Sequence, residues 1–144
     1  MENKQQSAAS HAMWVPLFHF VLVPIALINL LVVLYQMVRG FSLGSVWAFV
    51  MAFGFAAAVQ CIRAFAVKLQ DRIIRLEERI RLSQVLQEPL RSRIGDLSTS
   101  QLIGLRFASD GELSGLVKRA LDEKLSRKAI KQEIKQWRPD YERV

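Results

Sequence analysis

The sequence predicts an all-α membrane protein: a two-helix transmembrane hairpin whose second helix extends into a cytoplasmic stalk, followed by a small helical C-terminal region. The chain is 51% hydrophobic yet carries a net charge of +7. The two properties are separated, because Arg39 is the only fully charged residue between Trp14 and Arg63. In addition, nothing in the stretch 46–86 breaks a helix, although its first half is apolar and its second half is highly charged.

Residues 1–13 are polar and without periodicity, so we expect a flexible tail. They lack the basic region of a signal peptide, and we expect this segment to be retained. The first span covers 14–38, which as a helix is about 37 Å long at roughly 1.5 Å per residue. Because this exceeds a hydrocarbon core of about 30 Å, the span should tilt or bend, and Pro24 is the predicted bend.

A short polar turn at 39–45 leads to the second span at 46–67, so the hairpin (14–67) is antiparallel and both termini lie on one side. The positive-inside rule places that side in the cytoplasm, since only Arg39 lies in the turn. The basic residues that follow the second span are Arg63, Lys68, Arg72, Arg75, Arg79 and Arg81.

Small residues, which allow close helix packing in lipid, are found in the second span at Ala48, Ala52, Gly54, Ala56 and Ala58. Buried helices of a soluble bundle are the alternative, but the chain has no amphipathic helices long enough to cover two such runs.

The second span continues into an amphipathic cytoplasmic helix at 68–88. Its apolar residues alternate in spacings of three and four, which is the pattern of a coiled-coil seam over three heptads. The predicted self-association seam comprises Val59, Ile62, Ala66, Leu69, Ile73, Leu76 and Ile80. Acid-then-base pairs four residues apart, such as Glu77 with Arg81, agree with a helix. A single amphipathic helix that packs on the C-terminal helices or lies on lipid would show the same pattern.

The region 94–144 has the signals of three short helices. Ser98 with Gln101 predicts a capping box, and Ser109 with Glu112 repeats it. Ser126 is the predicted cap of the last helix, which should run to Trp137. Such a small region buries little surface alone, so we expect it to lean on the long helix, on a second copy or on a partner.

Candidate sites are few. A polar site at membrane depth would consist of His19, Asn29, Gln60 and Arg63, with Asn29 bonded across the hairpin or to another subunit. Contacts with anionic lipid head groups would come from Lys68, Arg72, Arg75 and Arg79. The single Cys61 is expected to be a small buried hydrophobe. We predict no metal site and no catalytic residues, because no His follows His19 and no Cys follows Cys61.

Three stretches resemble those of an uncharacterised family of small bacterial membrane proteins with two spans and a domain of unknown function. They are LQDRIIRLEERIRL, LSTSQLIGLRFASDGEL and KAIKQEIKQW, and the LIGLRFASDGEL segment is the most particular. The resemblance covers nearly the whole chain. It implies a location in the bacterial inner (cytoplasmic) membrane and implies no activity, ligand or catalytic residue.

These observations predict a non-enzymatic membrane protein without a cofactor that acts by helix-mediated association. Its partners would be the lipid bilayer, with anionic lipid among its contacts, and either itself or another membrane protein, as a homo-oligomer or accessory subunit. A haem- or pigment-binding subunit that uses His19 is one alternative. Binding of nucleic acid by the basic C-terminal helices is another, although 94–144 has ten basic and eight acidic residues and no strong basic surface. The row expected to face solvent in the last helix is Lys128, Lys131, Lys135 and Arg138.

Overall fold

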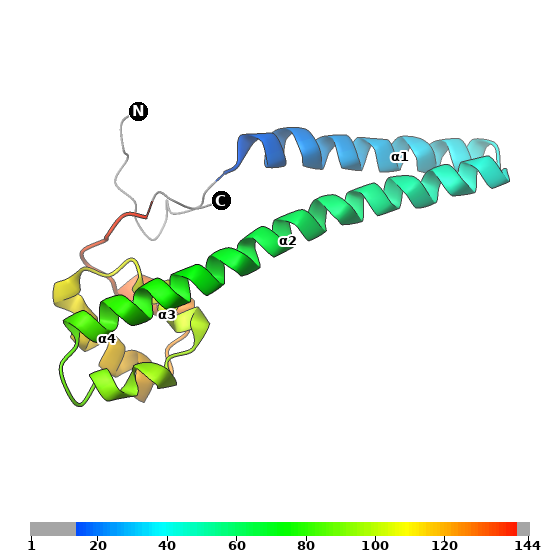
Figure 1. Cartoon of the computed structure of the whole chain (residues 1–144). Helices are drawn as coiled ribbons and strands as arrows, with labels where there is room; N and C mark the ends of the chain where they lie inside the picture. Colours follow the sequence, from blue (N-terminus) through cyan, green and yellow to red (C-terminus); the bar gives the residue numbers. More distant parts are fainter. Residues whose placement is uncertain (1–13, 141–144) are drawn as a thin grey trace. The chain divides into compact units, whose positions relative to one another are not determined.

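The computed structural model describes residues 14–140, and the described chain is built from helices, which confirms the predicted all-α class. Its only pairing of strand type there is an isolated bridge between Ala108 and Trp137. The helices are η1 (Leu17–Leu22), α1 (Val23–Arg39), α2 (Leu43–Val85), η2 (Arg91–Asp96), α3 (Thr99–Leu105), α4 (Asp110–Asp122) and α5 (Arg127–Glu133) (Figure 1). They form two compact units, a hairpin unit (14–68) and a head unit (69–140). The tail predicted at 1–13 lies outside the described residues.

The first helix of the hairpin unit begins with a π-helical turn, η1. In this turn the N–H of Val23 donates to the carbonyl of Phe18, five residues back. Pro24 follows at the start of α1 and has no N–H to donate. The irregularity predicted at Pro24 is therefore a widened turn just before the proline, which is one of the recognised responses of a helix to a local constraint.

The turn between the two long helices is closed by two serines. The N–H of Ser45 donates to Ser42 Oγ at 3.1 Å, and the N–H of Ser42 donates to Ser45 Oγ at 2.9 Å. This reciprocal pair caps α2, which then continues as one helix from the hairpin unit (43–68) into the head unit (69–85). Because Ser42 supplies the cap, α2 begins three residues before the predicted start at 46.

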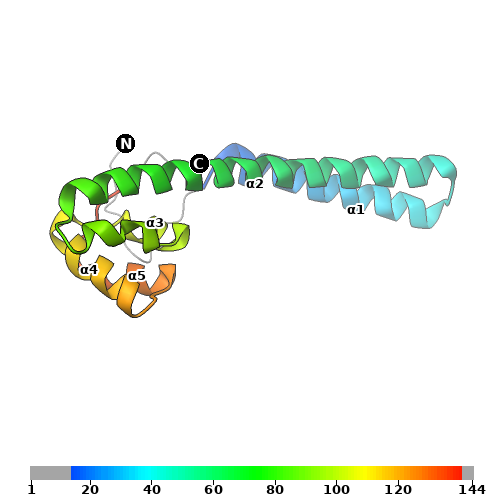
Figure 2. The same ribbon diagram turned by 60° about the horizontal axis from the view of Figure 1, so that its bottom comes forward.

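Within the hairpin unit, α1 and the first part of α2 lie side by side and antiparallel (Figures 1 and 2). The buried side chains are small: Ala26 is 5% exposed, Ala52 3% and Val59 5%. Ala48 and Ala56, spaced four residues on either side of Ala52, are half-buried, whereas Gly54 and Ala58 are exposed. The row of alanines predicted to permit close packing therefore belongs to the interface between the two helices of one chain.

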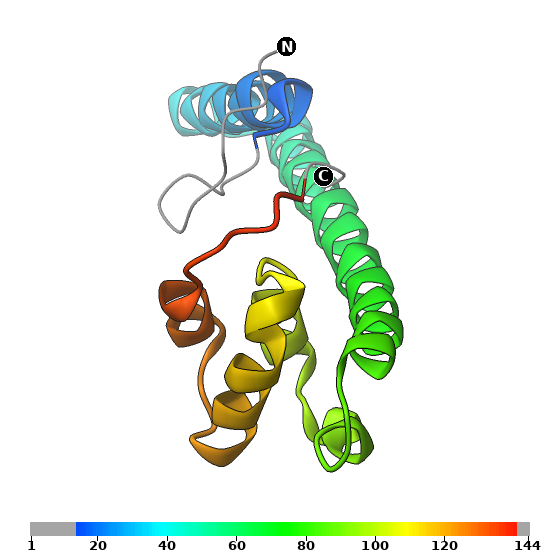
Figure 3. The same ribbon diagram turned by 90° about the vertical axis from the view of Figure 1, so that its left-hand side faces the viewer.

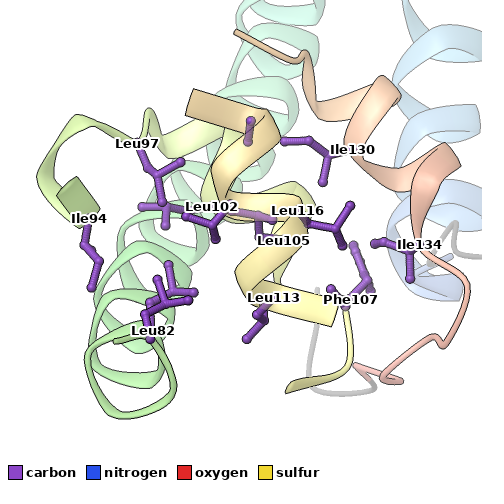
Figure 4. Packing of buried hydrophobic residues seen from close by; sticks show 14 residues of the cluster. Leu82, Ile94, Leu97, Leu102, Leu105, Phe107, Leu113, Leu116, Ile130 and Ile134 are labelled. Atoms are coloured by element: carbon purple, nitrogen blue, oxygen red, sulfur yellow. The ribbon is translucent and has the colours of Figure 1, made fainter. Parts of the chain in front are cut away.

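The head unit has a continuous apolar core (Figure 4). α3, α4 and α5 pack against one another, and α5 lies on the side of α3 and α4 that is remote from α2 (Figures 2 and 3). The core residues are Leu82, Leu86, Ile94, Leu97, Leu102, Leu105, Phe107, Ala108, Leu113, Leu116, Val117, Ala120, Ile130 and Ile134. Leu82 comes from α2 and Leu86 directly follows its last residue, so the small C-terminal region does lean on the long helix.

Two of the three predicted helix caps are confirmed. Ser98 and Gln101 form the full capping box, and Ser126 Oγ accepts from the N–H of Ala129. The box predicted at Ser109 is wrong, because Ser109 makes no side-chain cap bond. Its partner Glu112 is used elsewhere: the two carboxylate oxygens accept from the N–H groups of residues 135 and 136, at 3.1 and 2.8 Å.

The last helix is shorter than predicted, because α5 ends at Glu133 rather than at Trp137. The chain beyond it is extended and pairs with the α3–α4 connection. Arg138 N–H donates to Phe107 O at 2.7 Å, and Ser109 N–H donates to Gln136 O at 3.1 Å. These bonds satisfy backbone groups that a longer helix would have satisfied internally.

Candidate functional site

The most unusual surface of the head unit is a row of large apolar side chains on α2, which we call the α2 stripe. It consists of Leu69, Ile73, Leu76 and Ile80, which are 58%, 50%, 62% and 51% exposed. Their spacing of four, three and four places them on one face of a helix. A helix that is otherwise highly charged would normally bury such a row.

The head packs on a different face of the same helix. The α2 residues buried in the head unit are Ile74 (6% exposed), Glu78 (5%) and Leu82 (0%), spaced by four residues. The stripe and the head therefore do not compete for the same side of α2. The predicted seam also included three residues of the hairpin unit; Ile62 is 66% exposed and Ala66 is half-buried, but Val59 is buried.

Basic residues flank the stripe. Lys68, Arg72, Arg75 and Arg79, the predicted lipid head-group contacts, are all exposed. Glu77 is exposed as well. The predicted pair of Glu77 with Arg81 is wrong, because Arg81 points its guanidinium at other partners in the head.

Arg81 ties α2 to the connection between α3 and α4. It donates to Asp110 Oδ1 from Nε at 2.9 Å and from one terminal nitrogen at 2.6 Å. It also donates to the carbonyl oxygen of Ala108 at 2.7 Å and to Glu78 Oε2 at 3.3 Å. A planar guanidinium with five donors can hold this many acceptors at once, whereas lysine could not.

Glu78 is a buried acid beside Arg81. Burial raises the pKa of its carboxyl group, and the nearby charges of Arg81, Arg138 and Arg106 oppose that rise. The desolvation effect is the largest of these. The carboxylate is thus held in place by Arg81 while the surrounding protein disfavours its charge.

A second cluster surrounds Phe107, which is fully buried. The Trp137 ring centroid lies 5.0 Å from that of Phe107. Two cations lie over the ring, with Arg106 Cζ 4.5 Å and Lys131 Nζ 4.7 Å from its centroid. Lys131 is only 6% exposed, so the row predicted to face solvent in the last helix contains three exposed cations rather than four.

Charged side chains line two of the clefts in the head unit. One, of about 730 Å³, is lined by Glu78, Arg81, Arg106, Arg138 and Asp140 among others. Its charged groups bond to one another, since Arg81 pairs with Glu78 and Arg106 with Asp140 at 3.3 Å. The other cleft, of about 520 Å³, lies between the starts of α3 and α5 and includes Arg93, which pairs with Asp122. Both clefts have charged linings that are used, at least in part, for internal ion pairs.

The predicted polar site at membrane depth is not assembled within the described residues. His19 Nδ1 lies 3.1 Å from the N–H of Val15, in its own turn of helix. Arg63 instead lies over the ring of Phe18, with Cζ 5.6 Å from the centroid. Asn29 and Gln60 are exposed.

Two further predictions about this part of the chain change. Because Asn29 lies on the exposed outside of α1, a bond across the hairpin is not the use of its amide in the described structure. Cys61 was expected to be buried, but it is exposed, since the buried row of α2 passes through Ala52 and Val59 instead. In the described part of the chain, no three His, Cys, Asp or Glu residues are grouped to hold a metal ion.

The fold defines an all-helical protein with two helices, Leu17–Arg39 and Leu43–Val85, that are long and apolar enough to cross a membrane. The chain belongs to a family of unknown function, DUF6526, whose model matches residues 1–144. No match was found among curated proteins or among solved structures. The family membership confirms the resemblance to an uncharacterised family.

Sequence reasoning missed the polar bonds that hold the head together. Arg81, Asp110 and Glu112 make them across 23 to 29 residues of sequence. One signal was available: Arg106, Phe107, Asp110 and Glu112 all lie in LIGLRFASDGEL, the stretch singled out as most particular. Spacing rules could not find these bonds, because those rules describe neighbours on one helix.

Proposed function

We propose that this protein is a non-enzymatic integral membrane protein of the bacterial inner membrane that acts by helix-mediated association. The hairpin unit would be the anchor, and the head unit would lie in the cytoplasm with both termini. The association would be with itself, as a homo-oligomer, or with a larger membrane complex as an accessory subunit.

The burial pattern of the hairpin supports the membrane location. In the most apolar 18 residues of its two helices only 6% and 11% of residues are buried. In a soluble protein such helices would be covered by other parts of the chain, since a helix that is apolar all round needs an apolar environment. Lipid would provide that environment for both helices at once.

The charge pattern supports the orientation. Arg39 alone stands at the turn, whereas Arg63 and Lys68 begin a run of basic residues at the other end of the second apolar stretch. Cytoplasmic loops carry the excess of Lys and Arg in membrane proteins. A reporter that is active only in the cytoplasm should therefore be active when fused after Val144. A reporter that is active only in the periplasm should be inactive at the same position.

The single observation behind association is the α2 stripe. Four large apolar side chains at least half exposed, on a face that the head does not cover, are the kind of patch that marks a protein interface. The exposed Asn29 points in the same direction, because an amide that faces lipid is unfavourable unless another helix bonds to it.

The experiment replaces Ile73 by Asp in the full chain and measures the mass of the complex purified in a mild detergent. A buried carboxylate without a partner is strongly unfavourable, so the variant should lose association by at least tenfold. Arg75→Asp is the matched control, since it introduces the same group at an exposed position of α2 outside the stripe.

The control should behave like the parent protein. If Ile73→Asp keeps the mass of the parent complex, or if the parent itself is a lone chain in its native membrane, then the stripe is not an interface and the proposal fails.

A further inference from the structure

We propose that the partner of the α2 stripe is the stripe of a second copy of this chain, parallel and in register, as a two-stranded coiled coil. The inference rests on the proposed function for the use of the stripe, and it adds the identity, number and direction of the partner. It is carried by three observations: which face of α2 is open, which residues occupy it and how its flanking charges are placed.

The open face is the one a coiled coil needs. If Ile73 and Ile80 are assigned to position a of a heptad, then Leu69 and Leu76 fall at position d. Ile74, Glu78 and Leu82, which the head buries, then fall at positions b, f and c. Positions b, c and f point away from the partner in a coiled coil, so the head occupies the outside of such a dimer. Glu77 and Ile80 line the larger cleft beside the head, and both remain exposed.

The residue types favour two strands. Both a positions, Ile73 and Ile80, hold isoleucine, and both d positions, Leu69 and Leu76, hold leucine. A β-branched residue at a with leucine at d is the combination that favours parallel dimers over trimers and tetramers.

The flanking charges favour the parallel direction. Arg72 lies at position g and Glu77 at position e, and both are exposed. In a parallel, in-register pair, position g of one chain meets position e of the other five residues further on. Arg72 would then pair with Glu77 of the second copy, twice by symmetry. In an antiparallel pair, g meets g and e meets e, so with Leu69 opposite Ile80 of the partner Arg72 would meet Arg79. Glu77 would then meet Gln70 and would have no arginine partner.

The anchor adds to the same preference. Two copies with their hairpins in one membrane and their heads on one side present their α2 helices in the same direction. A seam of four residues is short, but tethering both chains to one surface raises their effective concentration for each other.

The experiment exchanges the charges in the full-length protein. Arg72→Glu alone, or Glu77→Arg alone, places like charges at both symmetric contacts and should weaken self-association roughly tenfold at low salt. The double variant Arg72→Glu with Glu77→Arg should restore the parent affinity. Arg75→Glu is the control, because it changes the same charge at an exposed position outside the g and e rows.

A mixture gives the sharpest result. Differently tagged Arg72→Glu and Glu77→Arg chains should prefer each other over themselves, because the mixed pair has opposite charges at both contacts. If the double variant is as weak as the single ones and the mixture shows no preference, the second copy is not the partner in this register. That result would leave the proposed function standing if Ile73→Asp still dissociates a complex.

Cysteine cross-linking tests the direction independently, in a Cys61→Ser background. In the parallel arrangement, Leu69→Cys chains should form disulfide dimers with themselves, and so should Ile80→Cys chains. In the antiparallel arrangement Leu69 would lie opposite Ile80, so cross-links would form only when the two variants are mixed. Dimers in the mixture alone would overturn the parallel assignment, and a complex mass of three or more chains would overturn the strand number.

Discussion

The two units of this molecule treat apolar side chains in opposite ways. In the hairpin unit the large ones, such as Phe53 at 60% and Leu31 at 55%, lie outside, and small residues such as Ala52 are buried. In the head unit the large ones, such as Phe107 and Leu102, are fully buried, and most charged side chains lie outside. The head supplies its own apolar interior, whereas the large apolar side chains of the hairpin would find apolar surroundings in the proposed membrane.

α2 belongs to both units, and this is why its stripe stands out. In the hairpin unit, exposed Ile62 follows the local rule that large apolar residues face outward. In the head unit, Leu69, Ile73 and Leu76 break the local rule, since they are exposed on a charged helix. In the stripe, as in the hairpin, large apolar side chains are exposed. The rest of the head unit buries such side chains.

The largest expected effect comes from replacing one phenylalanine by alanine in the head, compared with the same replacement in the hairpin. Phe107→Ala removes a fully buried ring against which Trp137 and two cations pack, so we expect the free energy of unfolding of the head to fall by about 3–5 kcal/mol. Hydrogen exchange, measured peptide by peptide on the full chain in detergent, should show faster exchange throughout α3, α4 and α5.

Phe53→Ala is the matched substitution in the hairpin. The Phe53 ring is 60% exposed, so its removal should leave exchange in the head at the parent rate. Equal effects of the two substitutions on the head would mean that the two units do not fold independently.

A smaller effect comes from the glycines of the head. A Cβ on Gly104 would lie 3.2 Å from Ile130 Cγ2 and 3.4 Å from the carbonyl oxygen of Arg127, so the Ile130 side chain would have to shift. Ile130 is fully buried and has no free space to move into, so the contact costs about 1–3 kcal/mol, of which the helix propensity of alanine offsets about 1 kcal/mol. Gly104→Ala should therefore lower the midpoint of thermal unfolding.

Gly115 in α4 provides the control, because the same substitution there should raise the unfolding midpoint instead of lowering it. Nothing lies within 4 Å of a Cβ at this position, so Gly115→Ala should gain up to about 1 kcal/mol from helix propensity alone. A rise of the unfolding midpoint in both variants would show that the close approach of α3 and α5 at Gly104 does not constrain the head.

The sequence predicted the helices well, because their signals are local. Each signal involves residues only a few positions apart. The capping box of Ser98 with Gln101 and the cap of Ser126 are both present in the structure. The predictions failed where a residue bonds to a group far away in the sequence instead of to its neighbours on the same helix. Glu112 caps no helix, since it bonds to the backbone at 135 and 136, and α5 ends early because its continuation pairs with Phe107 and Ala108.

The candidate site was likewise predictable only in its local part. Periodicity alone identified Leu69, Ile73, Leu76 and Ile80 as one row, but it could not say which face of α2 the head would use. That choice is made by contacts with distant residues, such as the bond of the Arg81 guanidinium to Asp110, 29 residues away, and the burial of Leu82 in the core of the head. Only the packed structure shows that the row remains open.

The smallest expected effect tests the buried acid at that junction. Because burial raises the folded-state pKa of Glu78 above its ordinary value of 4.5, folding favours the protonated form. The resulting stabilisation is complete below about pH 4.5 and is lost as the pH rises through the folded-state pKa. Glu78→Gln cannot ionise, so its stability relative to the parent should improve with rising pH, because only the parent must then keep a charged carboxylate in this buried position. Glu77→Gln, at the exposed neighbouring position, is the matched control, and the unfolding midpoints of both variants and the parent are compared at acidic and neutral pH. If Glu78→Gln instead loses stability as the pH rises, the Arg81 ion pair outweighs desolvation, and α2 is held to the head by charge rather than by its apolar face.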